Sequence, residues 1–93
     1  MFEAERIEKL SNLLRETSEA HREEHADTGG TDSEWPRWFA ERMAEPLGEI
    51  LDAEVEPERL ARLLVESEDE HLITAPGRDW PGYYAEFLIS RIM

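Results

Sequence analysis

The sequence of 93 residues has no cysteine, which excludes disulfide bonds, thiolate zinc sites and cysteine nucleophiles. It has no apolar run that approaches the roughly twenty residues of a membrane-spanning helix. Its first six residues contain no basic segment followed by an apolar one. Alternation of apolar and polar residues is nowhere long enough to predict a β-strand. Together these absences predict a soluble, cytoplasmic protein without strands.

Lysine is nearly absent as well, because Lys9 is the single lysine beside nine arginines. The 23 acidic residues outnumber the ten basic ones and give a formal net charge of −13. A surface without a basic patch does not suit phosphate backbones or anionic lipids, so we expect no nucleic-acid and no membrane partner. Such acidity is typical of a protein in a salty, halophile-like cytoplasm, where ions screen self-repulsion. The alternatives are a protein partner with a basic surface and, as a special case, an acidic decoy for that partner.

Two blocks of the sequence recur along the chain. Residues 13–21 align with residues 63–71, fifty positions later, and residues 35–43 align with residues 80–88, forty-five positions later. The loop between the two blocks is therefore five residues shorter in the second copy, a change that loops tolerate well.

The first block of each copy carries an apolar stripe with the three- and four-residue spacing of a helix. The stripes are Ile7, Leu10, Leu14, Thr17 and His21 in the first copy, and Leu60, Leu64, Ser67 and His71 in the second. Helical hairpins bury such stripes best against each other. We therefore expect an all-α fold, a four-helix arrangement of two helix–loop–helix repeats related by a pseudo-two-fold axis. It forms a single domain over residues 1–93, with the internal repeat at 3–52 and 55–93.

The ends of the aromatic helices are indicated by their local sequence. Asp79 precedes Trp-Pro in the second copy, and Asp32 or Ser33 precedes it in the first, so these side chains can cap the helices. In the first copy we expect Pro46 and Gly48 to kink or end the helix.

The histidine and Trp-Pro elements resemble those of a loose group of small bacterial and archaeal helical proteins, in which a Glu/His-rich helix precedes an Asp-Trp-Pro-x-Trp-Tyr-Ala helix. The matching residues are His21 with 32–41, and His71 with 79–86. The chain departs from the pattern at Phe39, where Tyr is usual, and at Glu34, where Asp is usual. The resemblance implies the element boundaries and points to the histidine and aromatic positions, but it implies no reaction.

The two histidines at the ends of the stripes are the leading candidates for a special site. A partly buried imidazole needs polar partners for its ring nitrogens. The candidate partners are Thr17 and Ser67, one turn before His21 and His71, the carboxylates of Glu41 and Glu86, and the indole N–H of Trp35 or Trp80. One interpretation is that each histidine is a polar plug that ties the two helices of its own copy together. The other is a ligand site between the histidines and the aromatic helices. Its candidate residues are His21, His71, Trp35, Trp38, Trp80, Tyr83, Glu41 and Glu86, with Trp38 and Tyr83 expected to be partly exposed.

A divalent metal ion is the candidate cofactor, with His21, His25 and His71 as candidate ligands. Residues 21–25 formally match the H-x-x-E-H pattern of inverted zinc peptidases. However, those enzymes are far larger, and the second copy has Ala75 where the second histidine would be needed. We therefore do not expect a peptidase, and no residue is assigned a catalytic role.

The sequence favours a non-enzymatic helical module that acts by homo-oligomeric protein–protein contact or by binding a small ligand between its histidine and Trp-Pro elements. A chain of this size buries a limited share of its surface, so a homodimer would add buried area. One alternative is a small metal-binding or metal-dependent enzyme using His21, His71, Glu41 and Glu86. The other is the acidic decoy.

Overall fold

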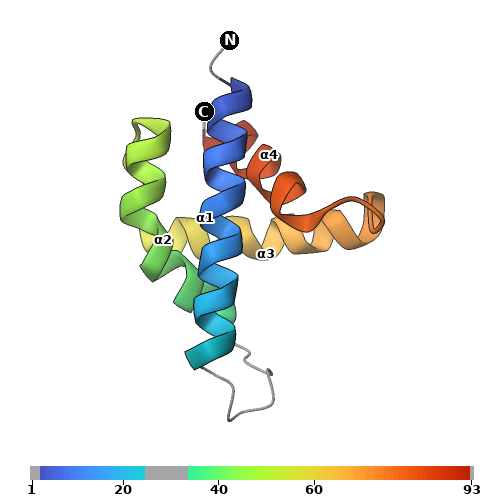
Figure 1. Ribbon diagram of the computed structural model, residues 1–93, viewed down its shortest axis with the longest axis horizontal. Helices are drawn as coiled ribbons and strands as arrows, with labels where there is room; N and C mark the ends of the chain where they lie inside the picture. Colours follow the sequence, from blue (N-terminus) through green and yellow to red (C-terminus); the bar gives the residue numbers. More distant parts are fainter. Residues whose placement is uncertain (1–2, 25–33, 93) are drawn as a thin grey trace.

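The computed structural model describes residues 3–24 and 34–92 of the chain, and in these ranges it contains four α-helices and no strand. The helices are α1 (Glu3–Glu24), α2 (Trp35–Leu51), α3 (Pro57–Thr74) and α4 (Trp80–Ile92) (Figure 1). The prediction of an all-helical protein with four helices is confirmed. None of these helices combines the length and apolar character needed to cross a membrane.

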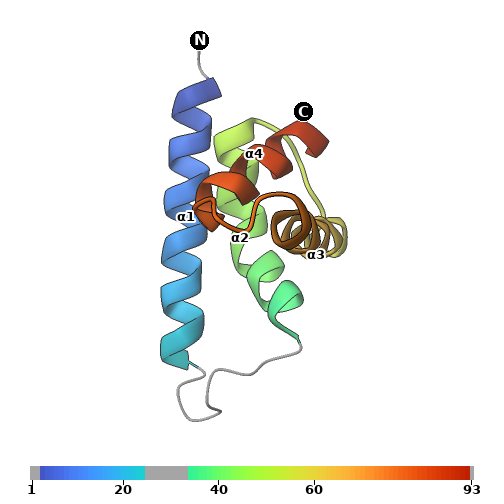
Figure 2. The same ribbon diagram turned by 90° about the vertical axis from the view of Figure 1, so that its right-hand side faces the viewer.

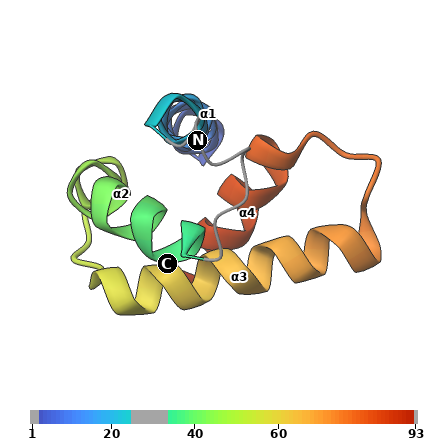
Figure 3. The same ribbon diagram turned by 90° about the horizontal axis from the view of Figure 1, so that it is seen from below.

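The two longest helices cross steeply and enclose the other two. Figure 1 shows α1 vertical and α3 horizontal, and Figure 3 shows α2 and α4 lying between them. Helix α1 packs against α2 and α4, and α3 packs against the same two helices. Each predicted hairpin, α1–α2 and α3–α4, is therefore also held to the other hairpin.

The core consists of the predicted stripes and the inward faces of α2 and α4. Leu10 and Leu14 of α1 and Leu60 and Leu64 of α3 are completely buried. The other hydrophobic residues of this core are Phe39, Ala40, Met43, Leu47, Leu51, Val55, Leu63, Tyr84, Ala85, Leu88 and Ile89. Thr17 and Ser67 continue the two stripes and are buried as well. The helical period of the stripes therefore predicts the buried face of α1 and α3 correctly.

The sequence predicts that Pro46 and Gly48 either kink or end the helix. Helix α2 does not end at Pro46 but continues through it to Leu51. Figure 2 shows the helix bending along its length, in line with the intrahelical hydrogen bond that a proline cannot donate. Asp52 follows the last helical residue and has the left-handed backbone conformation (φ 54°), and the N–H of Ala53 donates to the Gly48 carbonyl at 3.0 Å. Gly48 therefore lies in the last turn of α2 and does not stop the helix, while its carbonyl accepts the hydrogen bond that closes the chain reversal.

The capping predictions have different outcomes at the two aromatic helices. Glu34 precedes α2 and makes no capping bond with its side chain, and the predicted caps Asp32 and Ser33 lie outside the described residues. Before α4, the Asp79 carbonyl accepts the N–H of Tyr83 at 3.1 Å. The Asp79 carboxylate instead lies 3.8 Å from the Arg15 guanidinium of α1, so this side chain links two helices.

Candidate functional site: two histidine–aromatic clusters

The first cluster joins the last turn of α1 to the first turns of α2. The His21 ring packs against Trp38, with ring centroids 5.0 Å apart, and against Phe39 at 5.5 Å. Trp35 meets Phe39 edge-on at 5.3 Å. These four residues, called the first cluster below, bring together the histidine and Trp-Pro elements that the sequence singled out.

The second cluster is made in the same way from α3 and α4. The His71 ring lies 5.2 Å from that of Tyr83 and 5.9 Å from that of Tyr84. Trp80 meets Tyr84 edge-on at 5.1 Å. Edge-to-face contacts at such distances stabilise by about 0.5–1.5 kcal/mol beyond the area they bury. His71, Trp80, Tyr83 and Tyr84, the second cluster, therefore hold α3 against α4.

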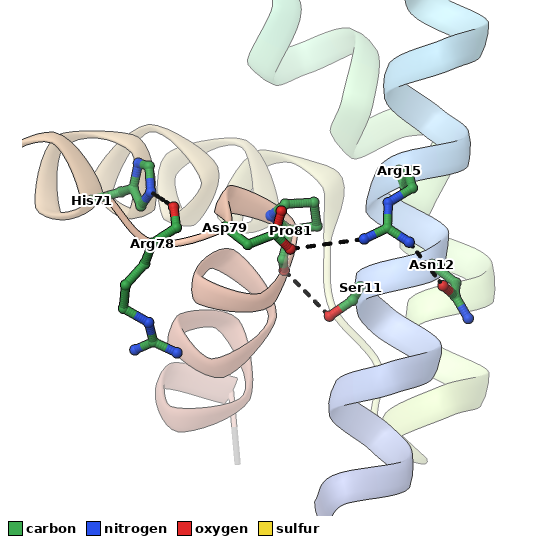
Figure 4. A network of polar contacts seen from close by, with 7 residues as sticks. All are labelled: Ser11, Asn12, Arg15, His71, Arg78, Asp79 and Pro81. Carbon is green, nitrogen blue, oxygen red and sulfur yellow. Dashed lines mark hydrogen bonds and ion pairs between the residues drawn. The ribbon is translucent and has the colours of Figure 1, made fainter. Parts of the chain in front are cut away.

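The polar partner of His71 is a backbone group of the following loop. Its Nε2 lies 2.7 Å from the Arg78 carbonyl oxygen (Figure 4). Because a carbonyl can only accept, Nε2 carries the proton in this hydrogen bond. The bond ties the end of α3 to the residues just before α4, as the structural interpretation of a polar plug requires.

The two hydroxyls expected beside the histidines bind elsewhere. Thr17 donates to the Leu13 carbonyl and Ser67 to the Leu64 carbonyl, each at 2.7 Å. Both hydroxyls thus donate their hydrogen bonds to backbone carbonyls of their own helices, as hydroxyls in the middle of a helix commonly do. Ser67, one of the candidate partners of His71, therefore bonds within its own helix, and His71 bonds to the loop instead.

The candidate carboxylates are held by arginines at the surface. Glu41 lies 3.4 Å from Arg37 on the same helix, and Glu86 lies 2.7 Å from Arg78. Both carboxylate side chains are about half exposed or more, at 61% and 48%. Exposed ion pairs of this kind contribute about 0–1 kcal/mol, so neither glutamate marks a dry reaction centre.

The described residues contain no group of three His, Cys, Asp or Glu side chains arranged to hold a metal ion. His21 and His71 lie in different hairpins, one at the end of α1 and the other at the end of α3. His25, the third candidate ligand, lies outside the described residues. The metal site of the alternative function stays a prediction.

Arginines cover an aromatic ring in each cluster, a feature that the sequence analysis missed. The Arg42 guanidinium lies 4.9 Å from the centre of the Trp38 ring, and that of Arg78 lies 5.6 Å from the centre of the Tyr83 ring. Trp38 and Tyr83 are half-buried, which agrees with the expected partial exposure. The spacing of Arg42 four residues after Trp38 was an available signal. Arg78 comes from a loop, so no helical spacing predicts its contact.

Burial and nearby negative charges raise the pKa of Tyr84 in the second cluster. This side chain is 7% exposed. Burial, followed by the negative charges of Glu68 and Asp69, raises the pKa of Tyr84 to about 12. The raised pKa keeps the phenol neutral, so Tyr84 serves as a packing residue and not as a proton-transfer group near neutral pH.

Polar contacts hold α4 to α1, whereas the residues of α3 that align with the α1 residues in these contacts are apolar. Ser11 donates to the Pro81 carbonyl at 3.4 Å beside the Arg15–Asp79 pair, and Figure 4 shows these residues together. The repeat aligns Ser11 and Arg15 with Ala61 and Val65. A shallow groove lies between α3 and the start of α2 at these positions, and it is lined by Glu34, Pro36, Arg37, Ala61, Arg62 and Val65.

Comparison of the chain with models of protein families, with curated proteins and with solved structures finds no match in any of the three. A functional proposal therefore depends on the contacts of the chain itself. The structure offers two packed histidine–aromatic clusters, carboxylates that pair with surface arginines, and an exposed face of α3.

Proposed function

We propose that this chain is a non-enzymatic helical module that acts by protein–protein contact, as a homodimer. The observation that carries the proposal is the exposure of large apolar side chains on α3. Val65 is 40% exposed, Leu72 is 62% exposed and Ile73 is 80% exposed. Apolar side chains that gather on one helix face of a small acidic protein are typical of a contact surface.

The two repeats supply the symmetry of the module, and we propose that a pseudo-two-fold axis relates them. Equivalent residues make similar contacts in the two copies, since His21 packs on Trp38 as His71 packs on Tyr83. Helix α2 packs on α3, and the equivalent helix α4 packs on α1. These correspondences support an origin of the domain from two copies of one hairpin.

Melting of the wild-type chain tests the proposed function directly. A dimer that dissociates on unfolding becomes more stable as the protein concentration rises. We expect the midpoint of thermal unfolding to rise by several degrees between about 5 μM and 500 μM chain, with sedimentation equilibrium giving an average mass that approaches twice the chain mass at the higher concentration. A midpoint and a mass that stay constant at the monomer value would exclude the homodimer.

The small metal-dependent enzyme is the second candidate from the sequence, and its test uses the histidines. If His21 and His71 are packing residues, the variant His21→Ala/His71→Ala should melt at a lower temperature than wild type. Its free energy of unfolding should fall by about 1 kcal/mol or more for each ring contact or hydrogen bond that is lost. Addition of Zn²⁺, Ni²⁺ or Mn²⁺ after treatment with chelator should then shift wild type and variant equally. A metal-specific stabilisation that only the wild type shows would establish a metal site and displace the proposed function.

The other two alternatives also stay predictions. A small ligand between the histidine and Trp-Pro elements would have to displace ring contacts of 5.0–5.9 Å between each histidine and its neighbours. An acidic decoy rests on the net charge of −13, and its binding to a basic partner would weaken steeply with added salt.

A further inference from the structure

The outward side of α3 forms a continuous face with helical spacing. We call the residues of this side the α3 outer face: Arg62, Val65, Glu66, Asp69, Leu72 and Ile73. All six are exposed, and they recur every three or four positions, so they lie along one side of the helix. The opposite side carries the buried residues Leu60, Leu64 and Ser67.

The apolar part of this face is specific to the second copy of the repeat. The positions of α1 that align with the α3 outer face are Asn12, Arg15, Glu16, Glu19, Arg22 and Glu23. All of these are polar or charged, and Arg15 is used in the ion pair with Asp79. The repeat thus keeps the buried stripe in both copies but places Val65, Leu72 and Ile73 at the surface in only one of them.

The charges of α3 are divided along its length. The N-terminal half carries Glu58, Arg59 and Arg62, which sum to a net charge of +1, and Arg37 of α2 lines the same shallow groove as Arg62. The C-terminal half carries Glu66, Glu68, Asp69 and Glu70. Two α3 helices placed antiparallel would bring the half with the net positive charge of each against the acidic half of the other. A parallel arrangement would place like charges together, so the distribution favours a second copy in one orientation.

Arg62 and Asp69 are the residues that fit this arrangement best. They are seven positions apart on the same side of the helix, and within the described ranges neither side chain makes an ion pair or a hydrogen bond. An antiparallel pair centred near Val65 and Glu66 places Arg62 of each copy opposite Asp69 of the second copy. The same contact brings Val65 near the axis and covers Leu72 and Ile73 with Arg59 and Glu58 of the second copy.

We propose that two copies of this chain dock through the α3 outer face, with their α3 helices antiparallel across a two-fold axis and Arg62 paired with Asp69 of the second copy. The proposal rests on the proposed function and names its surface. Helix α3 has 18 residues and is therefore about 27 Å long, so the contact is at the small end of specific interfaces. The expected dimer is accordingly weak, with a Kd in the range of about 1–100 μM.

Two charge reversals test the pairing. In Arg62→Glu alone, and in Asp69→Arg alone, both intermolecular pairs of the homodimer become repulsive, and we expect each variant to self-associate at least about tenfold more weakly than wild type. An equimolar mixture of the two variants restores both pairs in the heterodimer. We therefore expect the mixture to regain wild-type affinity, measured by sedimentation equilibrium with one variant labelled.

The matched controls make the same changes on α1. Arg22→Glu and Glu19→Arg change the net charge by the same amounts as the two test variants do, on the exposed face of the other repeat. They should leave self-association within about twofold of wild type. All four positions are exposed, so folding is checked by the far-UV circular dichroism and the melting midpoint of each variant.

The outcomes separate this proposal from the proposed function. A wild-type chain that stays monomeric overturns both. A wild-type dimer that both test variants form equally well overturns only the α3 interface, and so does a loss in both variants that the mixture fails to restore. Recovery in the mixture, with unaffected controls, supports the antiparallel pairing.

Discussion

Replacement of Gly48 by alanine is expected to lower the free energy of unfolding by about 2 kcal/mol or more. A Cβ atom at this position would lie 2.7 Å from the carbonyl oxygen of Ala53, which is closer than a carbon and an oxygen can approach without a shift. The obstacle is backbone, and it is held there by the hydrogen bond from the Ala53 N–H to the Gly48 carbonyl. The reversal after α2 would therefore have to open. Urea unfolding measures the loss.

The matched control is the same substitution at Gly82. There the nearest atom to a new Cβ is the Asp79 carboxylate oxygen at 3.9 Å, which is an ordinary contact. Because alanine favours the helix more than glycine does, Gly82→Ala should stabilise the protein by about 0.5–1 kcal/mol. Equal effects of the two substitutions would show that the close approach at Gly48 does not govern the stability of this turn.

The free energy of unfolding is also expected to fall by about 2 kcal/mol as the pH rises from about 10 to about 12. In the unfolded chain the Tyr84 phenol loses its proton near its ordinary pKa of 10.0, whereas in the folded chain burial and the nearby acids raise that pKa to about 12. Between these values the unfolded state releases a proton that the folded state keeps. Deprotonation therefore favours unfolding, while below pH 10 both states are protonated and Tyr84 makes no difference.

Tyr84→Phe should remove this alkaline loss and leave the stability at pH 7 almost unchanged. Phenylalanine suits the site, because Phe39 occupies the aligned position in the first cluster. Tyr83→Phe is the control, since it removes the neighbouring phenol and retains Tyr84, so the loss between pH 10 and 12 should remain. Urea unfolding at pH 7, 9, 10.5 and 11.5 measures the difference between the three proteins. An alkaline loss that persists in Tyr84→Phe would contradict the assignment.

The helices and their buried faces follow from short-range features of the sequence. Leu10 and Leu14, and Leu60 and Leu64, recur at helical spacing, and all four are completely buried. The match between the histidine and Trp-Pro blocks of the two copies also indicates that each histidine meets its own aromatic helix, as His71 meets Tyr83. Such inferences succeed because helix period and hairpin connection are local properties.

The polar partners did not follow from the sequence. The hydrogen bond from His71 goes to the Arg78 carbonyl, which any residue at position 78 would offer, so no residue type indicates it. Glu86 meets Arg78 and Asp79 meets Arg15 because loops and neighbouring helices bring them together, at sequence separations without a period. The chain has 33 Asp, Glu, Lys and Arg residues, so each charged surface side chain has many possible partners, and the pairs that form depend on the tertiary structure.

The sequence by itself determined the helical class, the repeat, the buried stripes and the association of each histidine with an aromatic helix, since periodic apolar spacing fixes which side of a helix avoids water. Only the tertiary structure decided that α1 and α3 cross steeply around α2 and α4, and that α2 continues through Pro46. It alone decided that Val65, Leu72 and Ile73 remain outside the core. The physical reason is that a stripe specifies a face to be buried, whereas the partner of that face and the crossing angle depend on how side chains from all four helices fill one shared core.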